Sequence, residues 1–571
     1  MGAIPTQASK TNMKNLINKL KNKDIAFFVL FFTITFTLIF LIRITIPEII
    51  SRDDGYLHAM RSYLGWNNEG YKPPVYTSFN NHPVDPYFLY HAGFKPFTSI
   101  YDNKDYNKLF LAVKIYHSIL VTIFLLFFCI IVYSLLKNKI KRKRDLRATS
   151  AFLTTLFFLS SFFFSVRLLM ERPQVFEMMA FMLISYLVIS KKTKTLFIVA
   201  LISPFFFSAT FLLFIPPGVY LIYKILIEKK WYGSFKPIVI CCLGLAIGIL
   251  LRPNVLNYLY SGYWMQSVSL FDAIFRSGKT GAPVELLAFT PSLEFAKQVF
   301  LMEVWLLPML LVIDLSFICK IFSFKKESYN EKLGFAAFLT FTLFTLTMIV
   351  SRALEIFLPV AFIFMIMFVI SFWDKIVPGL EEFIKTKRSL SAKRQGFLRI
   401  VIIIGFLIFS FSRIYNFQKS FNKNTLPYII EYKGISGYLQ TYAKENDLIH
   451  IENFGSYPML YFLNPKLSFT VGIDNAATYA YNPKIFWYIT HINIEKDKTC
   501  PKSECAESEK EDSFLVMRDK LSIKYIFIDT KMGVGKAPKN YGLNEYLKND
   551  KRYKLVFQDP NFENMKIYEL P

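Results

Sequence analysis

The sequence predicts a polytopic α-helical membrane protein with about 11 transmembrane helices, followed by a C-terminal soluble α/β domain. Of its 571 residues, 53% are hydrophobic and 61 are phenylalanine. The apolar residues form blocks rather than amphipathic patterns, and a block of about 20 apolar residues is long enough to span a bilayer. From about residue 416 onward, short alternating segments replace the blocks and predict strands.

The distribution of charge predicts orientation rather than a nucleic-acid partner. The formal net charge is +25, but no module of interleaved basic and aromatic residues accompanies it. The loop 43–108 balances its basic residues with acidic ones, whereas short connections between apolar blocks are strongly basic. This positive-inside pattern places the N-terminus and the basic connections in the cytoplasm. The basic segments are residues 10–23, 137–147, 191–194, 224–236, 320–332 and 375–399.

The membrane domain is predicted to cover residues 25–415, after a cytoplasmic lead of residues 1–24. Its block 195–227 is too long for one span, and Pro204 and Pro216 interrupt it. We therefore expect two short spans there, with an outer turn at residues 208–210. The other expected spans are 25–42, 109–136, 151–170, 175–190, 237–251, 300–321, 333–350, 353–373 and 400–412.

The first outer loop, residues 43–108, is too long for a plain connection, and long loops tend to be functional. Within it, residues 52–64 predict a surface helix. On such a helix Asp54, His58 and Arg61 are spaced i, i+4 and i+7 and share one face. That face offers a base, a tunable imidazole and a fixed cation, which predicts catalysis and substrate binding there.

Two adjacent carboxylates, Asp53 and Asp54, follow the first span, where charge is unfavourable unless it has a partner or a task. We expect at least one of them to be catalytic, and Asp54 is favoured because it leads the face that includes His58. The alternative is that one of them caps the following helix. A divalent metal bound by His58 is left open, and no other cofactor is predicted.

Further charged residues at outer helix ends are candidates for substrate binding. Glu171 and Arg172 precede the span that Pro173 begins, and the alternative for them is an ion pair or an interface anchor. A guanidinium suits a phosphate because its fork is rigid and always charged, whereas snorkelling is the structural alternative. The phosphate candidates are Lys114, Arg252 and Arg352, and weaker candidates in the turn at 82–86 are His82 and Asp85.

The other histidines and the polar cysteines have simpler interpretations. Structural roles are expected for His91, His117, His450 and His491. Cys500 and Cys505 lie in a polar loop, where a disulfide is one alternative in an oxidising compartment. A zinc site is disfavoured because no second cysteine or histidine pair follows at ligand spacing.

Residues 416–571 are predicted to form an α/β domain that is large enough for its own core. A helix is expected at 426–444. The charged segment 495–512 predicts a loop. The expected strands are 448–452, 467–471, 524–529, 552–559 and 565–569.

Several of these stretches carry a resemblance to a known superfamily. The acidic pair stands in Asp-Asp-Gly-Tyr-Leu-His-Ala-Met-Arg, Glu-Arg-Pro-Gln at 171–174 enters a span, and Ser-Arg-Ala-Leu-Glu-Ile-Phe-Leu-Pro at 351–359 begins a late one. With the broken pair of spans around 216–217, this layout resembles the GT-C superfamily of integral-membrane glycosyltransferases. The C-terminal part resembles the outer domains of a bacterial group of members through Asn-Phe-Gly-Ser-Tyr-Pro at 453–458 and Lys-Tyr-Ile-Phe-Ile-Asp at 524–529.

The resemblance implies an inverting glycosyltransferase with a polyprenyl-phosphate-linked sugar donor, and either Asp54 or Asp53 inherits the role of base. It implies a bacterial inner membrane, a periplasmic C-terminal domain, and a glycan, lipid or protein of the envelope as acceptor. The glycine and nearby histidine after the acidic pair depart from the aminoarabinose and protein-mannosyl branches, so sugar and acceptor stay open. Two alternative functions also stay open, namely a transporter or flippase for lipid-linked saccharide and a non-catalytic envelope assembly partner.

Overall fold

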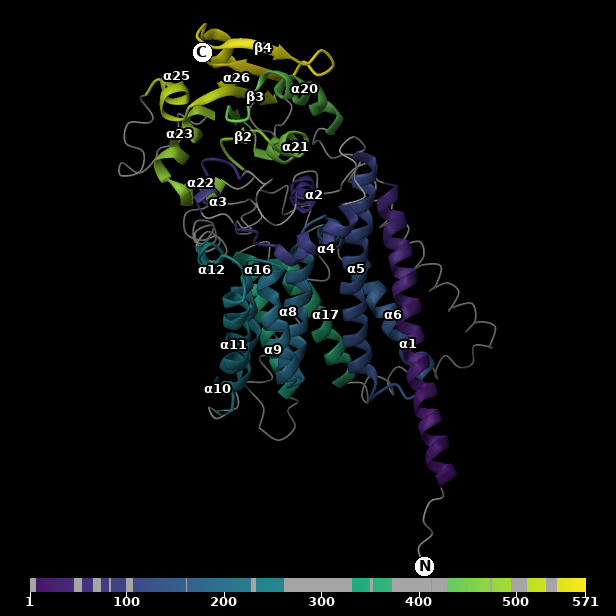
Figure 1. Cartoon of the computed structure of the whole chain (residues 1–571). Coiled ribbons are helices and arrows are strands. Elements are labelled where there is room, and N and C mark those ends of the chain that lie inside the picture. The colour runs from purple at the N-terminus through teal and green to yellow at the C-terminus, as the bar shows by residue number, and fades with distance from the viewer. Residues whose placement is uncertain are drawn as a thin grey trace, which may run out of the picture.

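The chain folds into a bundle of apolar helices with an α/β unit at one end, while the first helix, α1 (Gln7–Ile44), runs along the side of the bundle (Figure 1). In this computed structural model, short helices of the first outer loop lie between the bundle and the α/β unit. The structure describes residues 7–45, 54–64, 73–81, 84–98, 106–160, 162–226, 229, 233–260, 331–349, 353–371, 412, 429–452, 454–472, 475–493, 511–529 and 542–571.

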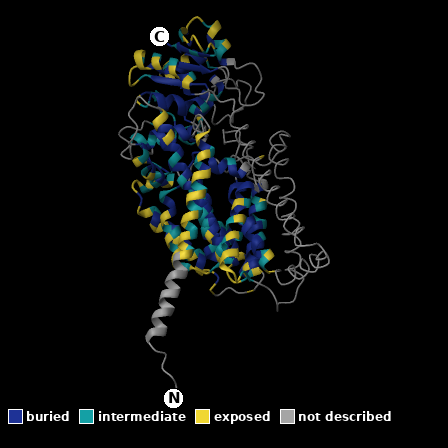
Figure 2. Ribbon diagram, turned by 90° about the vertical axis from the view of Figure 1, so that its right-hand side faces the viewer, coloured by how far each residue is buried: buried dark blue, intermediate teal, exposed yellow. Residues whose placement is uncertain are grey.

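Among the described residues, three helical segments are long and apolar enough to cross a membrane, and the fold class is that of a membrane protein. The number of spans stays a prediction, because residues 300–321 lie outside the described part, as does nearly all of 400–412. The outward face of α1 is apolar and exposed, as expected for contact with lipid (Figure 2). The three segments are Lys23–Ile44 of α1, Asn107–Leu136 of α5 (Tyr106–Leu136) and α17 (Leu354–Ser371).

Shorter helices make up the rest of the described bundle. The predicted span 151–170 is wrong as a single helix, because α6 (Lys143–Ser160) ends and α7 (Phe162–Leu169) begins within it. Serine is a weak helix former, and the hydroxyl of Ser165 donates to the carbonyl of Phe158 across the break. The block 195–227 does fold into two short helices separated by a turn. The elements that follow are α8 (Gln174–Ile189), α9 (Thr193–Ile202), η1 (Ser203–Phe205), η2 (Thr210–Phe214), α10 (Ile215–Leu226), α11 (Lys236–Leu250), α12 (Val255–Tyr258) and α16 (Glu331–Ile349).

Two glycines allow α9 and α11 to pack closely. A Cβ atom on Gly248 would lie 2.2 Å from the carbonyl oxygen of Leu201, and one on Gly244 would lie 2.8 Å from the Cβ atom of Ala200. Small residues four positions apart let the backbones of membrane helices approach each other. The Gly244 and Gly248 pair therefore sets the distance between these two helices.

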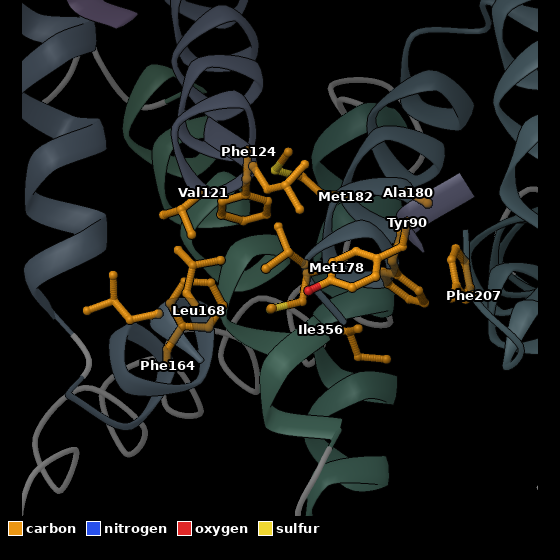
Figure 3. Packing of buried hydrophobic residues seen from close by; sticks show 14 of the residues in the cluster. Tyr90, Val121, Phe124, Phe164, Leu168, Met178, Ala180, Met182, Phe207 and Ile356 are labelled. Atoms are coloured by element: carbon orange, nitrogen blue, oxygen red, sulfur yellow. The ribbon is translucent and has the colours of Figure 1, made fainter. Parts of the chain in front are cut away.

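Aromatic and aliphatic side chains fill the interior of the bundle (Figure 3). The rings of Phe128 and Phe157 stack with their centroids 4.1 Å apart, and Phe362 of α17 lies 5.4 Å from Phe157. Phe124 and Met182, both labelled in Figure 3, belong to the same buried cluster. This packing joins α5, α6, α8 and α17 into one core.

The α/β unit contains a five-stranded sheet in the order β2-β1-β3-β5-β4. β1 is parallel to β2 and to β3, whereas β5 is antiparallel to β3 and to β4. All five predicted strands are confirmed, although β2 has only two residues. The strands are β1 (Leu448–Ile451), β2 (Ser468–Phe469), β3 (Ile523–Asp529), β4 (Lys554–Gln558) and β5 (Met565–Glu569).

Helices surround the sheet. The predicted helix at 426–444 is described as η7 (Ile429–Tyr432) followed by α20 (Lys433–Tyr442). The other helical elements are η8 (Phe454–Ser456), α21 (Tyr457–Leu463), α22 (Asn475–Tyr481), α23 (Pro483–Asn493), α25 (Ser513–Leu515), η9 (Val516–Lys520) and α26 (Gly542–Asn549).

The first outer loop pairs with the β2 end of this sheet. The backbone N–H of Val75 donates to the carbonyl of Phe469 at 2.8 Å. The N–H of Tyr76 donates to the carbonyl of Thr470 at 3.0 Å, and its hydroxyl donates to the carbonyl of Leu521 at 2.7 Å. An extended segment that adds to a sheet edge satisfies backbone groups that would otherwise be unpaired. The α/β unit is therefore attached to the membrane part by the loop that carries the candidate residues.

Candidate active site

The first-loop candidates lie on α2 (Asp54–Leu64), which is buried between the bundle and the α/β unit. The predicted helix is confirmed, but its prediction as a surface helix is wrong. Tyr56 and Ala59 have no exposed surface. The ring of Tyr56 lies 5.8 Å from that of Phe110 on α5 and 5.2 Å from that of Phe462 on α21. The apolar face of α2 is therefore covered on both sides.

A chain of hydrogen-bonded side chains connects α2 with the turn before α4 (Phe88–Thr98). Asp54 is the first residue of α2, and His58 lies one turn further on. Nδ1 of His58 is 2.9 Å from Nε2 of His91 on α4. Nδ1 of His91 is in turn 2.7 Å from Oδ2 of Asp85. We call these three side chains the Asp85–His91–His58 chain.

Burial and nearby charge determine the protonation states within the Asp85–His91–His58 chain. Burial, together with the charge of Arg61, lowers the pKa of His58 well below 6.5. Burial opposes a charge on Asp85, but His91 and Arg61 outweigh it and hold the pKa of Asp85 well below its usual range. At neutral pH the chain therefore has a carboxylate at one end and a neutral imidazole at the other.

Polar and aromatic contacts surround the segments that carry the two imidazoles. The hydroxyl of Ser62 on α2 donates to the carbonyl of His91 at 2.8 Å. The rings of Tyr87 and Tyr90 meet the ring of His58 edge-on, each with its centroid 5.4 Å away. Because the chain is enclosed in this way, His58 and His91 are each only 5% exposed.

Two arginines lie close to the Asp85–His91–His58 chain. Nη2 of Arg61 donates to the carbonyl of Val84 at 3.3 Å. Arg172 is buried immediately before α8, and its positive charge contributes to the lowered pKa of His58. The structure therefore brings Arg172 near His58 and Arg61, although more than one hundred residues of sequence separate it from them.

Arg252 supports the turn that carries Asp85. Its guanidinium donates to the backbone carbonyls of Asp85 and Pro204 and lies 3.9 Å above the ring of Tyr258. A third contact reaches the carbonyl of Pro86 at 3.4 Å. These contacts favour a positioning role, and phosphate binding by Arg252 stays a prediction.

Glu171 forms a buried ion pair with Arg43 at the end of α1, which confirms the ion-pair alternative for this glutamate. Arg43 also donates to the carbonyl of Leu169. A second buried pair joins Arg167 of α7 to Glu355 of α17, with Nε and Oε1 2.6 Å apart. These two pairs join α1 to the segment before α8, and α7 to α17. A role of Glu171 in substrate binding stays a prediction.

The remaining candidates divide into described and undescribed residues. Lys114 is buried in α5. Within the described ranges, no group of three or more histidine, cysteine, aspartate or glutamate side chains is arranged to hold a metal ion. A metal at His58 stays a prediction. The undescribed candidates are Asp53, His82, Arg352, Cys500 and Cys505.

His91 is the residue whose place in the site sequence reasoning missed. It was expected to have a structural role, but it stands between His58 and Asp85. A usable signal was present, because a carboxylate three residues before a helix can reach an imidazole in the first turn of that helix. Tyr87 and His91 are also spaced i and i+4, which places both on the face that meets His58.

The carboxylate position, the imidazole and the arginines of this site together suit the removal of a proton next to an anion such as phosphate. The start of α2 carries a carboxylate position, a neutral imidazole follows one turn later, and arginines lie within reach of that imidazole. Carboxylates and imidazoles are the usual general bases of enzymes, and arginines are the usual partners of phosphates.

The fold of this chain is similar to that of a solved membrane enzyme. That structure is the archaeal oligosaccharyltransferase AglB from Archaeoglobus fulgidus, in complex with an inhibitory peptide and a dolichol-phosphate. It matches with a TM-score of 0.55 and 11% sequence identity, over 93% of this chain and 73% of that chain. At this identity the likeness establishes the fold alone.

A second structure of the Archaeoglobus fulgidus oligosaccharyltransferase, tethered through a disulfide bond to an acceptor peptide containing the NVT sequon, is also similar to this chain. Its TM-score is 0.46 at 11% identity, with the same shares of 93% and 73% covered. By sequence, no family model and no curated protein matches this chain.

Proposed function

We propose that this chain is a membrane glycosyltransferase that moves a sugar from a polyprenyl-phosphate-linked donor to an envelope acceptor, with Asp54 as the base. The position of α2 carries the proposal. On a GT-C fold, a helix that begins with an aspartate is buried between the bundle and the α/β unit, with imidazoles and arginines around it. The AglB structure holds a dolichol-phosphate and a peptide, which supports a lipid-linked donor and a separate acceptor for this chain.

The proposed reaction gives each group a task. The base removes a proton from the acceptor as the acceptor attacks the anomeric carbon, and cations stabilise the departing phosphate. Asp54 or its neighbour Asp53 supplies the base. A single displacement of this kind inverts the anomeric carbon.

Arg61 and Arg172 are the strongest candidates for the phosphate, because both lie beside His58 at the buried end of the site. Lys114 and Arg352 are additional candidates for the same task, and His82 and Asp85 are candidates in the turn before α4. The polyprenyl chain is expected to stay among lipids beside the exposed apolar face of α1. We place the reaction on the periplasmic side of a bacterial inner membrane, with the α/β unit on that side.

Transfer assays with the full chain in lipid nanodiscs test the proposal. Polyprenyl-phosphate sugars and an envelope extract are supplied, and sugar incorporation is followed by mass spectrometry. We expect Asp54→Asn to lower the rate about 100-fold or more, because general-base catalysis contributes about 10²–10⁴-fold. The matched control is Asp145→Asn, which neutralises an exposed aspartate in the first turn of α6.

The outcomes separate the alternatives. Transfer by the wild-type chain that Asp145→Asn keeps and Asp54→Asn loses supports the proposal. Equal transfer by the double variant Asp53→Asn/Asp54→Asn refutes the base assignment. Movement of lipid-linked saccharide across vesicles without covalent transfer favours a flippase, and the absence of both favours an assembly partner.

A further inference from the structure

The Asp85–His91–His58 chain suggests a function beyond the support of α2. We propose that it is a proton relay, in which Nε2 of His58 takes up the proton that the base at the start of α2 removes from the acceptor. The inference rests on the proposed function, because it assigns a route to the proton of that reaction. It makes His58 the receiving group, and His91 and Asp85 positioning residues.

Hydrogen-bond chemistry fixes the direction of the relay. Asp85 is a carboxylate and can only accept, so His91 donates from Nδ1 across the distance of 2.7 Å. A neutral His91 then has its lone pair on Nε2. That nitrogen accepts from Nδ1–H of His58 at 2.9 Å. Nε2 of His58 is therefore left with a lone pair, ready to accept a proton.

The proton balance of the step is simple. Nε2 of His58 gains a proton while Nδ1 of the same ring passes its own proton to Nε2 of His91. His91 becomes an imidazolium, and its positive charge lies beside the carboxylate of Asp85. No charge is left on His58, where burial opposes it. A relay of this form explains how an imidazole that resists protonation can still receive a proton.

After the proton is received, the groups around the relay favour the positive charge at its Asp85 end rather than on His58. The groups that act electrostatically on His58 are His91 of α4, Arg61 of α2, Asp85 of the preceding turn and Arg172 before α8. Both arginines disfavour a positive charge on His58, whereas Asp85 favours one on its direct partner His91. In the chain, Asp54 and His58 stand one turn apart on α2.

The relay predicts a change in the pH profile of transfer that a purely structural role would not produce. The relay must be unprotonated before it can receive a proton, so kcat/KM falls on the acid side of its pH profile. Asp85→Asn keeps the shape of the side chain and removes the negative charge of the carboxylate. We expect the acid limb of the profile to move to lower pH by about one unit or more, with a plateau about 10–100-fold lower.

A matched control separates the relay from the packing of α2 on α4. Ser62→Ala removes a hydrogen bond between the same two helices, to the carbonyl of His91, without touching either imidazole. We expect its pH profile to match that of the wild-type chain. The relay is overturned if Asp85→Asn lowers kcat/KM at every pH without shifting the acid limb of the profile. The proposed function would still stand in that case, because the wild-type chain would still transfer the sugar.

A second readout does not depend on activity. The chain has six histidines, so ¹⁵N-histidine labelling and solid-state NMR can assign His58 and His91 through the variants His58→Gln and His91→Gln. Above the acid transition we expect Nδ1–H and an unprotonated Nε2 on both rings. A neutral His58 that carries its proton on Nε2 overturns the relay, whether or not the wild-type chain transfers a sugar.

Discussion

The stability of the α/β unit is predicted to depend on the protonation of Glu452. This residue follows β1, and Asp529 ends β3. Because the two strands are parallel neighbours, both carboxyl groups lie at the same edge of the sheet. Asp529 accepts from Nδ2 of Asn564 at 2.8 Å and from the hydroxyl of Tyr432 at 3.3 Å. Burial and the charge of Asp529 raise the pKa of Glu452 from 4.5 to about 8.

The sign of the effect follows from linkage. In the unfolded chain Glu452 loses its proton near pH 4.5, whereas in the folded chain it keeps the proton up to about pH 8. The free energy of unfolding therefore falls as the pH rises through this window and levels off above it. At 1.36 kcal/mol per pH unit, the difference corresponds to roughly 5 kcal/mol at most.

Glu452→Gln imitates the protonated side chain at every pH. We expect the stabilities of the variant and the wild-type chain to differ by less than about 1 kcal/mol at pH 5, and the variant to be more stable by roughly 2–5 kcal/mol at pH 9. Urea unfolding of the full chain in detergent, read by pulse proteolysis of the α/β unit, measures the difference. The control is Glu563→Gln, an exposed carboxylate of the same unit. The reasoning is refuted if Glu452→Gln changes stability equally at both pH values, or if wild-type stability rises between pH 5 and 8.

Two further predictions concern the bundle. Gly248→Ala places a Cβ 2.2 Å from a backbone oxygen of α9, so we expect the free energy of unfolding to fall by about 1–3 kcal/mol. A Cβ on Gly218 meets nothing within 4 Å, so the control Gly218→Ala should leave the melting temperature in nanodiscs almost unchanged. Arg43→Met leaves the buried charge of Glu171 uncompensated and should lower the free energy of unfolding by about 3–5 kcal/mol. The double variant Arg43→Met/Glu171→Met should lower it clearly less. A double variant as unstable as Arg43→Met alone would contradict the pairing.

The parts of the fold that local patterns determine were predictable. β3 reads Ile-Lys-Tyr-Ile-Phe-Ile-Asp, and a short apolar run of β-branched and aromatic residues is typical of a strand in the middle of a sheet. The prolines at 204 and 216 correctly divided one apolar block into two short helices. The break between α6 and α7 was missed, because two serines between apolar residues do not interrupt an apolar pattern.

The site was predictable only in part, because its neighbours come from distant segments. The spacing of Asp54 and His58 on one helix followed from local sequence and is confirmed. The partner of His58 is His91 on another helix, 33 residues away. The guanidinium of Arg252 reaches the turn of Asp85 across 167 residues. Such contacts depend on tertiary packing, which a single sequence does not show.

The burial of α2 joins the two halves of the chain into one functional unit. Tyr56 of α2 contacts Phe462 of the α/β unit, and Val75 extends the sheet of that unit. An isolated helix of 11 residues is marginal in water, so α2 keeps Asp54 and His58 on one face only while the bundle and the α/β unit pack against it. The α/β unit can therefore act on the proposed reaction by holding α2 in place, which requires none of its own residues at the reacting atoms.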